Sequence, residues 1–235
     1  MQRLVTAGVT VIPCTGRPFP GALPWVTRLG LPGPIICYQG AQVRTLDGSL
    51  LLDHGIPHEL AMEVVRYAQE RNLHVQAYRD DMLIIARDRP EAHQYAEHAS
   101  MDVHVVGDLD GRMGPTTPKL VIVGPAATLE AMLPETRRRW AGRLTVATST
   151  PDYLEFTSAE SDKASALRFL CERFGVAQSE VAAVGDGRND ASMIAWAGLG
   201  VAVEGSPSEV LVAADRTIPG PGHGGIVQLA EALLT

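Results

Sequence analysis

The sequence predicts an α/β fold, a Rossmann-like core with a parallel sheet, into which a smaller α+β domain is inserted. Near both ends of the chain, apolar strands that end at glycine-containing turns alternate with amphipathic helices, as in a doubly wound sheet. Between about residues 54 and 150, helices are instead separated by pairs of short strands, which is typical of an α+β unit. We therefore expect a core domain of residues 1–53 and 151–235 and an inserted domain of residues 54–150.

The stretch 181–190 combines an apolar run, a glycine turn and two carboxylates. The run before Gly185 predicts a strand buried on both faces, and the helical spacing that follows predicts a helix capped by Asn189 or Asp190. Asp186 would then lie at the carboxyl end of a strand, where open α/β sheets bind ligands. Asp-Gly between apolar runs is also typical of a β-hairpin, an alternative that the helical spacing disfavours.

Two carboxylates four positions apart, Asp186 and Asp190, with Asn189 beside the second, suit a hard cation with oxygen ligands. Mg²⁺ commonly takes one or two protein carboxylates and completes its shell with water and phosphate. The alternative is a pair of solvated acids that only cap the helix.

The composition excludes several classes of protein. A net charge of -7 and an isoelectric point near 5.5 give no basic surface for nucleic acid. No apolar run approaches the ~18 residues that span a bilayer, and the first residues lack the features of a signal peptide. Cys14, Cys37 and Cys171 lack metal-site spacing and suit a reducing compartment. We expect a soluble cytoplasmic protein without nucleic-acid or membrane partners, and nothing indicates its oligomeric state.

The chain begins with residues that read as the end of a helix, closed by Gly8, and continues into an apolar strand, Val9 to Cys14. Thr15-Gly16-Arg17-Pro18 follows directly. Thr15 offers a hydroxyl group and Gly16 allows close approach of the backbone to a ligand, although such turns also occur in loops without function.

Lys163 precedes a helix that Gly175 ends. The first turn of a helix carries positive potential, so a lysine there is disfavoured unless it reaches an anion. A phosphate contact and a surface lysine pointing into water both remain open from this position alone.

Three motifs occur in order around the insert: Thr15-Gly16-Arg17-Pro18, Ser161-Asp162-Lys163 and Gly185-Asp186-Gly187-Arg188-Asn189-Asp190. Together they resemble the haloacid-dehalogenase-like phosphatases of the Cof type, and the resemblance covers nearly the whole chain. It implies a HAD-like core, with the insert as a cap that closes over the active site.

The resemblance also implies roles for individual residues. Thr15, with the amides of Gly16 and Arg17, would hold the phosphoryl oxygens, and Lys163 would neutralise charge on the phosphoryl group and the nucleophile. The residues of the third motif would act as follows: Asp186 would ligate Mg²⁺, Asn189 would contact substrate or nucleophile, and Asp190 would complete the metal shell.

The implied activity is magnesium-dependent hydrolysis of a small phosphorylated metabolite, foremost a sugar phosphate, through an aspartyl-phosphate. Arg79, Asp80 and Asp81, expected on a hairpin loop of the cap, are candidates for touching that substrate, the alternative being a solvated turn.

The chain departs from the family pattern at its start. The family's first motif, Asp-x-Asp-Gly-Thr, supplies the nucleophile on the central strand, and it is absent here. Leu109-Asp110-Gly111 lies in the insert, and Asp47-Gly48 reads as a hairpin turn. We expect roughly 20 to 30 residues of strand and helix upstream of Met1. Without them the chain is expected to fold poorly, because buried strands would keep unpaired backbone groups.

A second departure is Gln39, where the family usually has Asn before Gly-Ala. Two further functions stay open. A non-catalytic protein that has lost the nucleophile would bind a phosphorylated metabolite without turnover. A phosphotransferase or mutase on the same scaffold would pass the phosphoryl group to a second sugar instead of to water.

Overall fold

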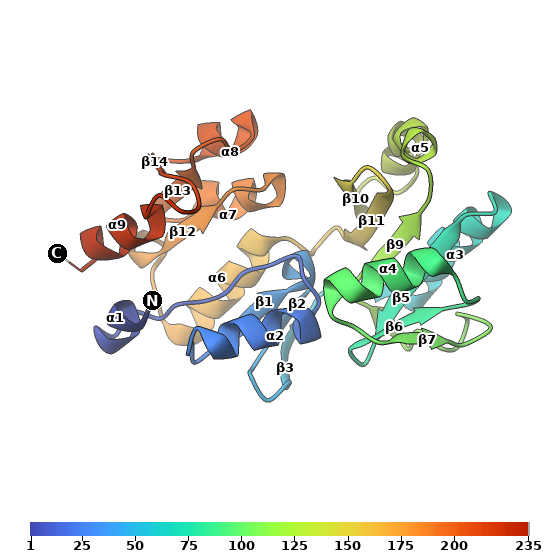
Figure 1. Cartoon of the computed structure of the whole chain (residues 1–235), viewed down its shortest axis with the longest axis horizontal. Helices are drawn as coiled ribbons and strands as arrows, with labels where there is room; N and C mark the ends of the chain where they lie inside the picture. The colour runs from blue at the N-terminus through green and yellow to red at the C-terminus, as the bar shows by residue number, and fades with distance from the viewer. Residues whose placement is uncertain (235) are drawn as a thin grey trace.

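The computed structural model describes residues 1–234, without the side chains of His98 and Ser149. Figure 1 shows two lobes, a core built from both ends of the chain and a cap built from its middle. None of the helices in the described part of the chain combines the length and the apolar character needed to cross a membrane. The core elements are α1 (Gln2–Thr6), α2 (Phe19–Arg28), β1 (Ile35–Cys37), η1 (Tyr38–Gly40), β2 (Gln42–Arg44), β3 (Leu50–Asp53), α6 (Lys163–Phe174), η2 (Gln178–Glu180), β12 (Ala182–Gly185), η3 (Arg188–Asp190), α7 (Ala191–Trp196), β13 (Leu199–Val203), α8 (Ser208–Ala213), β14 (Arg216–Ile218) and α9 (Gly225–Ala232).

The cap is a six-stranded sheet in the order β10-β11-β9-β5-β6-β7, with helices on both faces. Its elements are β4 (Ile56–Pro57), α3 (His58–Glu70), β5 (His74–Arg79), β6 (Met82–Ile85), α4 (Pro90–Ala99), β7 (Val103–Val105), β8 (Thr116–Thr117), β9 (Leu120–Val123), α5 (Ala126–Arg139), β10 (Leu144–Thr150) and β11 (Tyr153–Ser158). The chain therefore leaves the cap after Ser158, not at residue 150, because β11 pairs on both edges, with β9 and with β10.

The alternation of side chains along the cap strands builds two apolar layers. Leu120 and Ile122 of β9 pack with α3 and α5 in one cluster. Val121 and Val123, on the other face, share a second cluster with α4 and with α2 and β1 of the core. The second layer thus continues from the cap into the core.

The core contains two separate sheets. β12, β13 and β14 are parallel, whereas β1, β2 and β3 form an antiparallel meander. The hairpin alternative for the 181–190 stretch is wrong, because β12 pairs in parallel with β13 and the turn after it leads into η3 and α7.

The expected strand from Val9 to Cys14 forms only one bridge, the parallel pair Cys14 with Ile36. The amide of Ile36 donates to the Pro13 carbonyl at 2.9 Å on that side. Its other edge has no partner strand among residues 1–234, and neither has the edge of β12 that points away from β13.

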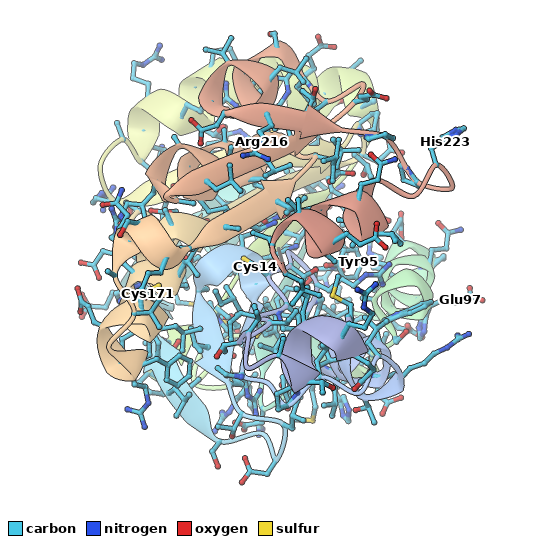
Figure 2. All side chains as sticks on the ribbon, turned by 90° about the vertical axis from the view of Figure 1, so that its left-hand side faces the viewer. Cys14, Tyr95, Glu97, Cys171, Arg216 and His223 are labelled. Carbon is cyan, nitrogen blue, oxygen red and sulfur yellow. The ribbon has the colours of Figure 1, made fainter. Side chains whose placement is uncertain are left out.

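These two free edges border one cavity of about 570 Å³. Its lining comes from residues 8–14, from residues 180–184 leading into β12, and from apolar side chains of α6 and α9. Figure 2 views this side of the molecule, with Cys14 and Cys171 of the lining labelled below the β12–β14 sheet. The core sheet is therefore divided by a slot between two unpaired edges.

Candidate active site

Four segments bring polar groups to one end of the core. The extended segment ends at Thr15, β1 leads to Gln39, β12 ends before Asp186, and α6 starts at Lys163. A methyl group in place of a hydrogen of Gly16 would lie 2.5 Å from Nε2 of Gln39. This end of the core is therefore densely packed, in the place expected for a ligand at the carboxyl ends of parallel strands.

Lys163 and Asp190 form a buried ion pair. Nζ of Lys163 lies 2.5 Å from Oδ1 of Asp190, and both residues are 5% exposed. The other carboxylate oxygen of Asp190 accepts from the amides of Asp186 and Gly187, at 3.0 and 2.9 Å. The carboxylate of Asp190 therefore fixes both the lysine and the turn that carries Asp186.

The start of α6 is stabilised by a side-chain cap next to Lys163. Asp162 caps α6, its Oδ1 accepting from the amides of Ala164 and Ser165 at 2.6 and 3.0 Å. A negative side chain there is favoured by the helix dipole, which offsets the unfavourable place of the lysine. The hydroxyl of Ser161, which is 4% exposed, has no hydrogen-bond partner in the part of the chain that the structure describes.

The turn at Thr15 keeps two hydrogen-bond donors for a ligand. Oγ1 of Thr15 accepts from the amide of Arg17 at 3.1 Å, which leaves its own hydroxyl hydrogen unused. Among the residues described, the amide of Gly16 has no acceptor. The Arg17 amide, expected to face a phosphoryl group, is thus engaged within the turn.

Asp186 is the carboxylate that can hold a metal ion. It is exposed, and within residues 1–234 its carboxylate has no hydrogen-bond or ion-pair partner. No cluster of three or more His, Cys, Asp or Glu side chains suited to a metal ion exists in the described part of the chain. One free carboxylate beside the well-anchored Asp190 suits Mg²⁺, which keeps several waters and takes phosphate oxygens.

Cys14 lies directly before the turn at Thr15. Burial raises the pKa of its thiol to about 12, a rise that nearby Lys163 only partly offsets. Because the thiolate is the reactive form, this shift disfavours nucleophilic chemistry at Cys14.

Gln39, which the sequence marked only as a departure from the family pattern, lies beside the predicted site residues. Its Oε1 accepts from Nδ2 of Asn189, an exposed residue of η3. Its position after strand β1 is the signal that could have found it, because Thr15 and Asp186 follow strands in the same way.

The hairpin loop of the cap lies against the core. Nη1 of Arg44 lies 2.5 Å from Oδ1 of Asp81, and both side chains are half-buried. Arg79 donates to Asp80 and to the carbonyl of Arg112, at 3.1 and 2.7 Å. These contacts hold the loop beside β2.

A family model described as a haloacid dehalogenase-like hydrolase matches residues 1–229. The chain belongs to this family. The predicted assignment to phosphatases of this type is confirmed, as is the α/β class with a parallel-sheet core.

Curated proteins and solved structures are similar to this haloacid dehalogenase-like hydrolase over most of its length. A curated HMP-PP phosphatase of Serratia proteamaculans is 28% identical over 201 residues, covering 86% of this chain and 73% of that protein. A haloacid dehalogenase-like hydrolase from Bacteroides thetaiotaomicron superimposes with a TM-score of 0.88 and 27% identity, over 98% of this chain and 89% of that one. A Thermotoga maritima structure gives a TM-score of 0.87 and 30% identity, over 98% and 87%.

Proposed function

We propose that the protein is a magnesium-dependent phosphomonoester hydrolase acting on a small phosphorylated metabolite, foremost a sugar phosphate. The observation that carries this proposal is the arrangement around the buried Lys163–Asp190 pair. Beside it lie a carboxylate on Asp186 and donors on Thr15 and Gly16, none of which has a partner within residues 1–234. A phosphoryl group needs such donors and such charge neutralisation, which carry most of the catalysis of phosphoryl transfer.

Each residue has a role that its surroundings support. The Thr15 hydroxyl and the Gly16 amide bind phosphoryl oxygens, and Lys163 neutralises negative charge on the reacting group. Asp186 would ligate Mg²⁺, with Asp190 completing the shell through water, because its own oxygens already accept three hydrogen bonds. When bound, the ion supplies positive charge that stabilises the transferred phosphoryl group.

The nucleophile in this proposal is an aspartate on a strand that precedes residue 1. The slot of about 570 Å³ supports it, because the slot lies between two edges that have no partner strand among residues 1–234, and each edge is parallel to the strand on its other side. A strand placed there in parallel would pair with both edges, and its carboxyl end would reach the turn of Thr15 and the turn of Asp186. An aspartate at that end would attack the phosphorus and displace the alcohol of the phosphomonoester, and water would then hydrolyse the aspartyl-phosphate to release inorganic phosphate.

The substrate class rests on the cap and on the relatives. In this proposal the cap, which contacts the core through Asp81 and Tyr78, excludes water and selects the substrate, with Arg79, Asp80 and Asp81 as candidate contacts. The Serratia proteamaculans relative is named HMP-PP phosphatase. A structure titled a sugar phosphatase shares the fold alone, at 16% identity and a TM-score of 0.79.

The test combines intact mass with turnover. We would isolate the protein from its natural source, compare its mass with 25.1 kDa, and screen small phosphomonoesters with Mg²⁺ and with a chelator. A heavier species with an upstream Asp-x-Asp and chelator-sensitive release of phosphate is expected. Transfer to a second sugar would instead indicate a phosphotransferase. A mass of residues 1–235, with phosphate binding but no turnover, would overturn the hydrolase in favour of a binding protein.

A further inference from the structure

We propose that Gln39 binds the phosphoryl group directly, its Nε2 donating to a phosphoryl oxygen above Gly16. This inference rests on the proposed function, because it adds one ligand to the same phosphate site. It differs from that proposal in naming a neutral side-chain donor that none of the three motifs contains.

The backbone around Gln39 is held from two sides. The amide of Gln39 donates to the Thr15 carbonyl at 3.2 Å, which ties it to the phosphate-facing turn. A methyl group on Gly40 would lie 2.3 Å from the carbonyl oxygen of Asp162, so the η1 turn packs directly against the start of α6. Gln39 is therefore fixed between the turn of Thr15 and the helix that carries Lys163.

Gln39 adopts a left-handed conformation, with φ 62° and ψ 24°. This conformation costs a non-glycine residue free energy and is best tolerated by Asn, Asp and Gly. It turns the side chain toward the site, where the carboxamide covers Gly16: Nε2, Cδ and Oε1 would lie 2.5, 2.8 and 3.0 Å from a methyl group on that glycine. Strain of this kind is often found where a side chain must be aimed at a ligand.

The hydrogen bond with Asn189 fixes the orientation of the carboxamide. Oε1 of Gln39 accepts from Nδ2 of Asn189, so Nε2 carries the free donors. Within the described residues, Nε2 has no acceptor, and the side chain is only half-buried. The free N–H groups of Gln39 thus lie over Gly16, whose own amide is also unused.

The ligand chemistry follows from these donors. A phosphoryl dianion has only acceptor atoms, and an amide N–H donates to an anion without adding charge. The Thr15 hydroxyl, the Gly16 amide and Nε2 of Gln39 are three neutral donors on one side, with Lys163 supplying the positive charge. An Asn at this position would be one methylene shorter, and it would not reach Asn189 while covering Gly16.

The test uses Gln39→Glu, which keeps the size of the side chain and an oxygen for Asn189 but replaces the donor with a carboxylate oxygen. Binding of inorganic phosphate in the presence of Mg²⁺ is measured by calorimetry, with Gln228→Glu on exposed α9 as the control that makes the same charge change away from the site. We expect Gln39→Glu to weaken binding about 10- to 100-fold and the control to leave it within about two-fold.

A pH series and a second variant separate binding from a structural role. The new carboxyl group has a reference pKa of about 4.3 and is partly protonated near pH 5. The difference in phosphate affinity between wild type and Gln39→Glu should therefore become smaller as the pH falls toward 5. Gln39→Asn should keep the melting temperature, because Asn tolerates the left-handed conformation, and yet bind phosphate about 10-fold more weakly.

The outcomes distinguish this inference from the function on which it rests. Wild-type affinity in Gln39→Glu would overturn the role of Gln39 and leave the hydrolase standing. Equal loss of melting temperature and affinity in Gln39→Asn, with no change of the ratio with pH, would reduce Gln39 to a structural residue. A wild-type protein that does not bind phosphate would overturn both proposals.

Discussion

At the scale of single residues, the site is organised by one buried carboxylate. Asp190 accepts from Lys163 with one oxygen and from the amides of Asp186 and Gly187 with the other. A buried charge is tolerated only when it is paired and hydrogen-bonded, and both conditions hold for Asp190. Asp186 is the opposite case, because its exposed carboxylate has no partner within residues 1–234. Asp190 therefore stabilises the fold around the site, whereas the carboxylate of Asp186 is available for a ligand.

Replacing Lys163 with Met should destabilise the protein strongly. The change leaves the carboxylate of Asp190 buried without a counter-charge, which costs about 3 to 5 kcal/mol. Urea unfolding of Lys163→Met, Asp190→Asn and the double variant measures this effect. The double variant should lose clearly less free energy of unfolding than the sum of the two single variants. A Lys163→Met protein within about 0.5 kcal/mol of wild type would contradict the buried pair.

Replacing Asp186 with Asn should affect metal binding without affecting stability. The carboxylate makes no contact that the fold needs, so the free energy of unfolding should stay within about 0.5 kcal/mol. Mg²⁺ affinity in the presence of phosphate should fall about 10-fold or more, because a charged oxygen ligand is lost. Calorimetric titration checks this, with Glu172→Gln, at the opposite end of α6 from Lys163, as the control. Equal Mg²⁺ affinity in the Asp186→Asn and Glu172→Gln variants would show that Asp186 does not ligate the metal ion.

At the scale of secondary structure, α6 shows how a local signal serves the site. The helix begins with a capping box between Asp162 and Ser165 and ends at Gly175, which has a φ of 67°. Lys163 is the first helical residue, so the same cap that starts the helix also sets the direction of the lysine. The order of strand, turn and helix around β12 and α7 places Asp186 in a comparable way.

Removing the cap of α6 should have a defined cost. Asp162→Ala deletes the acceptor of the Ala164 and Ser165 amides, and we expect a loss of about 1 to 2 kcal/mol in the free energy of unfolding. Asp162→Asn keeps an acceptor and should lose much less, which makes it the matched control. Chemical denaturation followed by circular dichroism gives both values, and equal stabilities of the two variants would argue against the capping role.

At the scale of the whole molecule, the cap and the core share one apolar layer. Tyr38 of the core and Tyr78 of the cap meet edge to face, with ring centroids 5.5 Å apart, and both are buried. Two polar contacts cross the same junction: the ion pair of Arg44 with Asp81, and the hydrogen bond from Thr116 to Asp53 at 3.1 Å. The structure therefore presents a cap docked on the core.

The ion pair across this junction can be tested against its exposed neighbour. Asp81→Asn removes the charge that faces Arg44, whereas Asp80→Asn changes an acid that is 74% exposed and pairs with Arg79. Both acids have positive φ, which Asn tolerates, so the backbone of the turn is preserved. We expect Asp81→Asn to speed amide exchange in α4 about 5- to 10-fold, equivalent to about 1 kcal/mol, and Asp80→Asn to change it little. Equal exchange in the two variants would show that Arg44 does not hold the cap.

The slot beside β12 belongs to this scale as well. Its two edges, at Val9 to Cys14 and at β12, lie far apart in the sequence and meet at one cavity that side chains of α6 and α9 also line. The segment from Val9 to Cys14, which was expected to be a strand, lacks regular pairing because it has a neighbouring strand on one edge only. The poor folding of residues 1–235 alone stays a prediction.

Much of this protein was determined by its sequence alone. The strand that ends at Gly185, the helical turn after it, the end of α6 at Gly175 and the three motifs that resemble haloacid dehalogenase-like hydrolases could be predicted. These features could be predicted because periodicity, helix caps and glycine turns depend on residues that are close together in the sequence, within one or two helical turns.

Other features were decided by the tertiary structure. Gln39 meets Asn189 across 150 positions, β11 joins the cap sheet past residue 150, and Asp81 pairs with Arg44 of the core. The amide of Arg17 is taken by Thr15, and both oxygens of Asp190 are engaged. These contacts depend on which surfaces pack together and on which hydrogen-bonding groups are left unpaired, and only the folded chain fixes either.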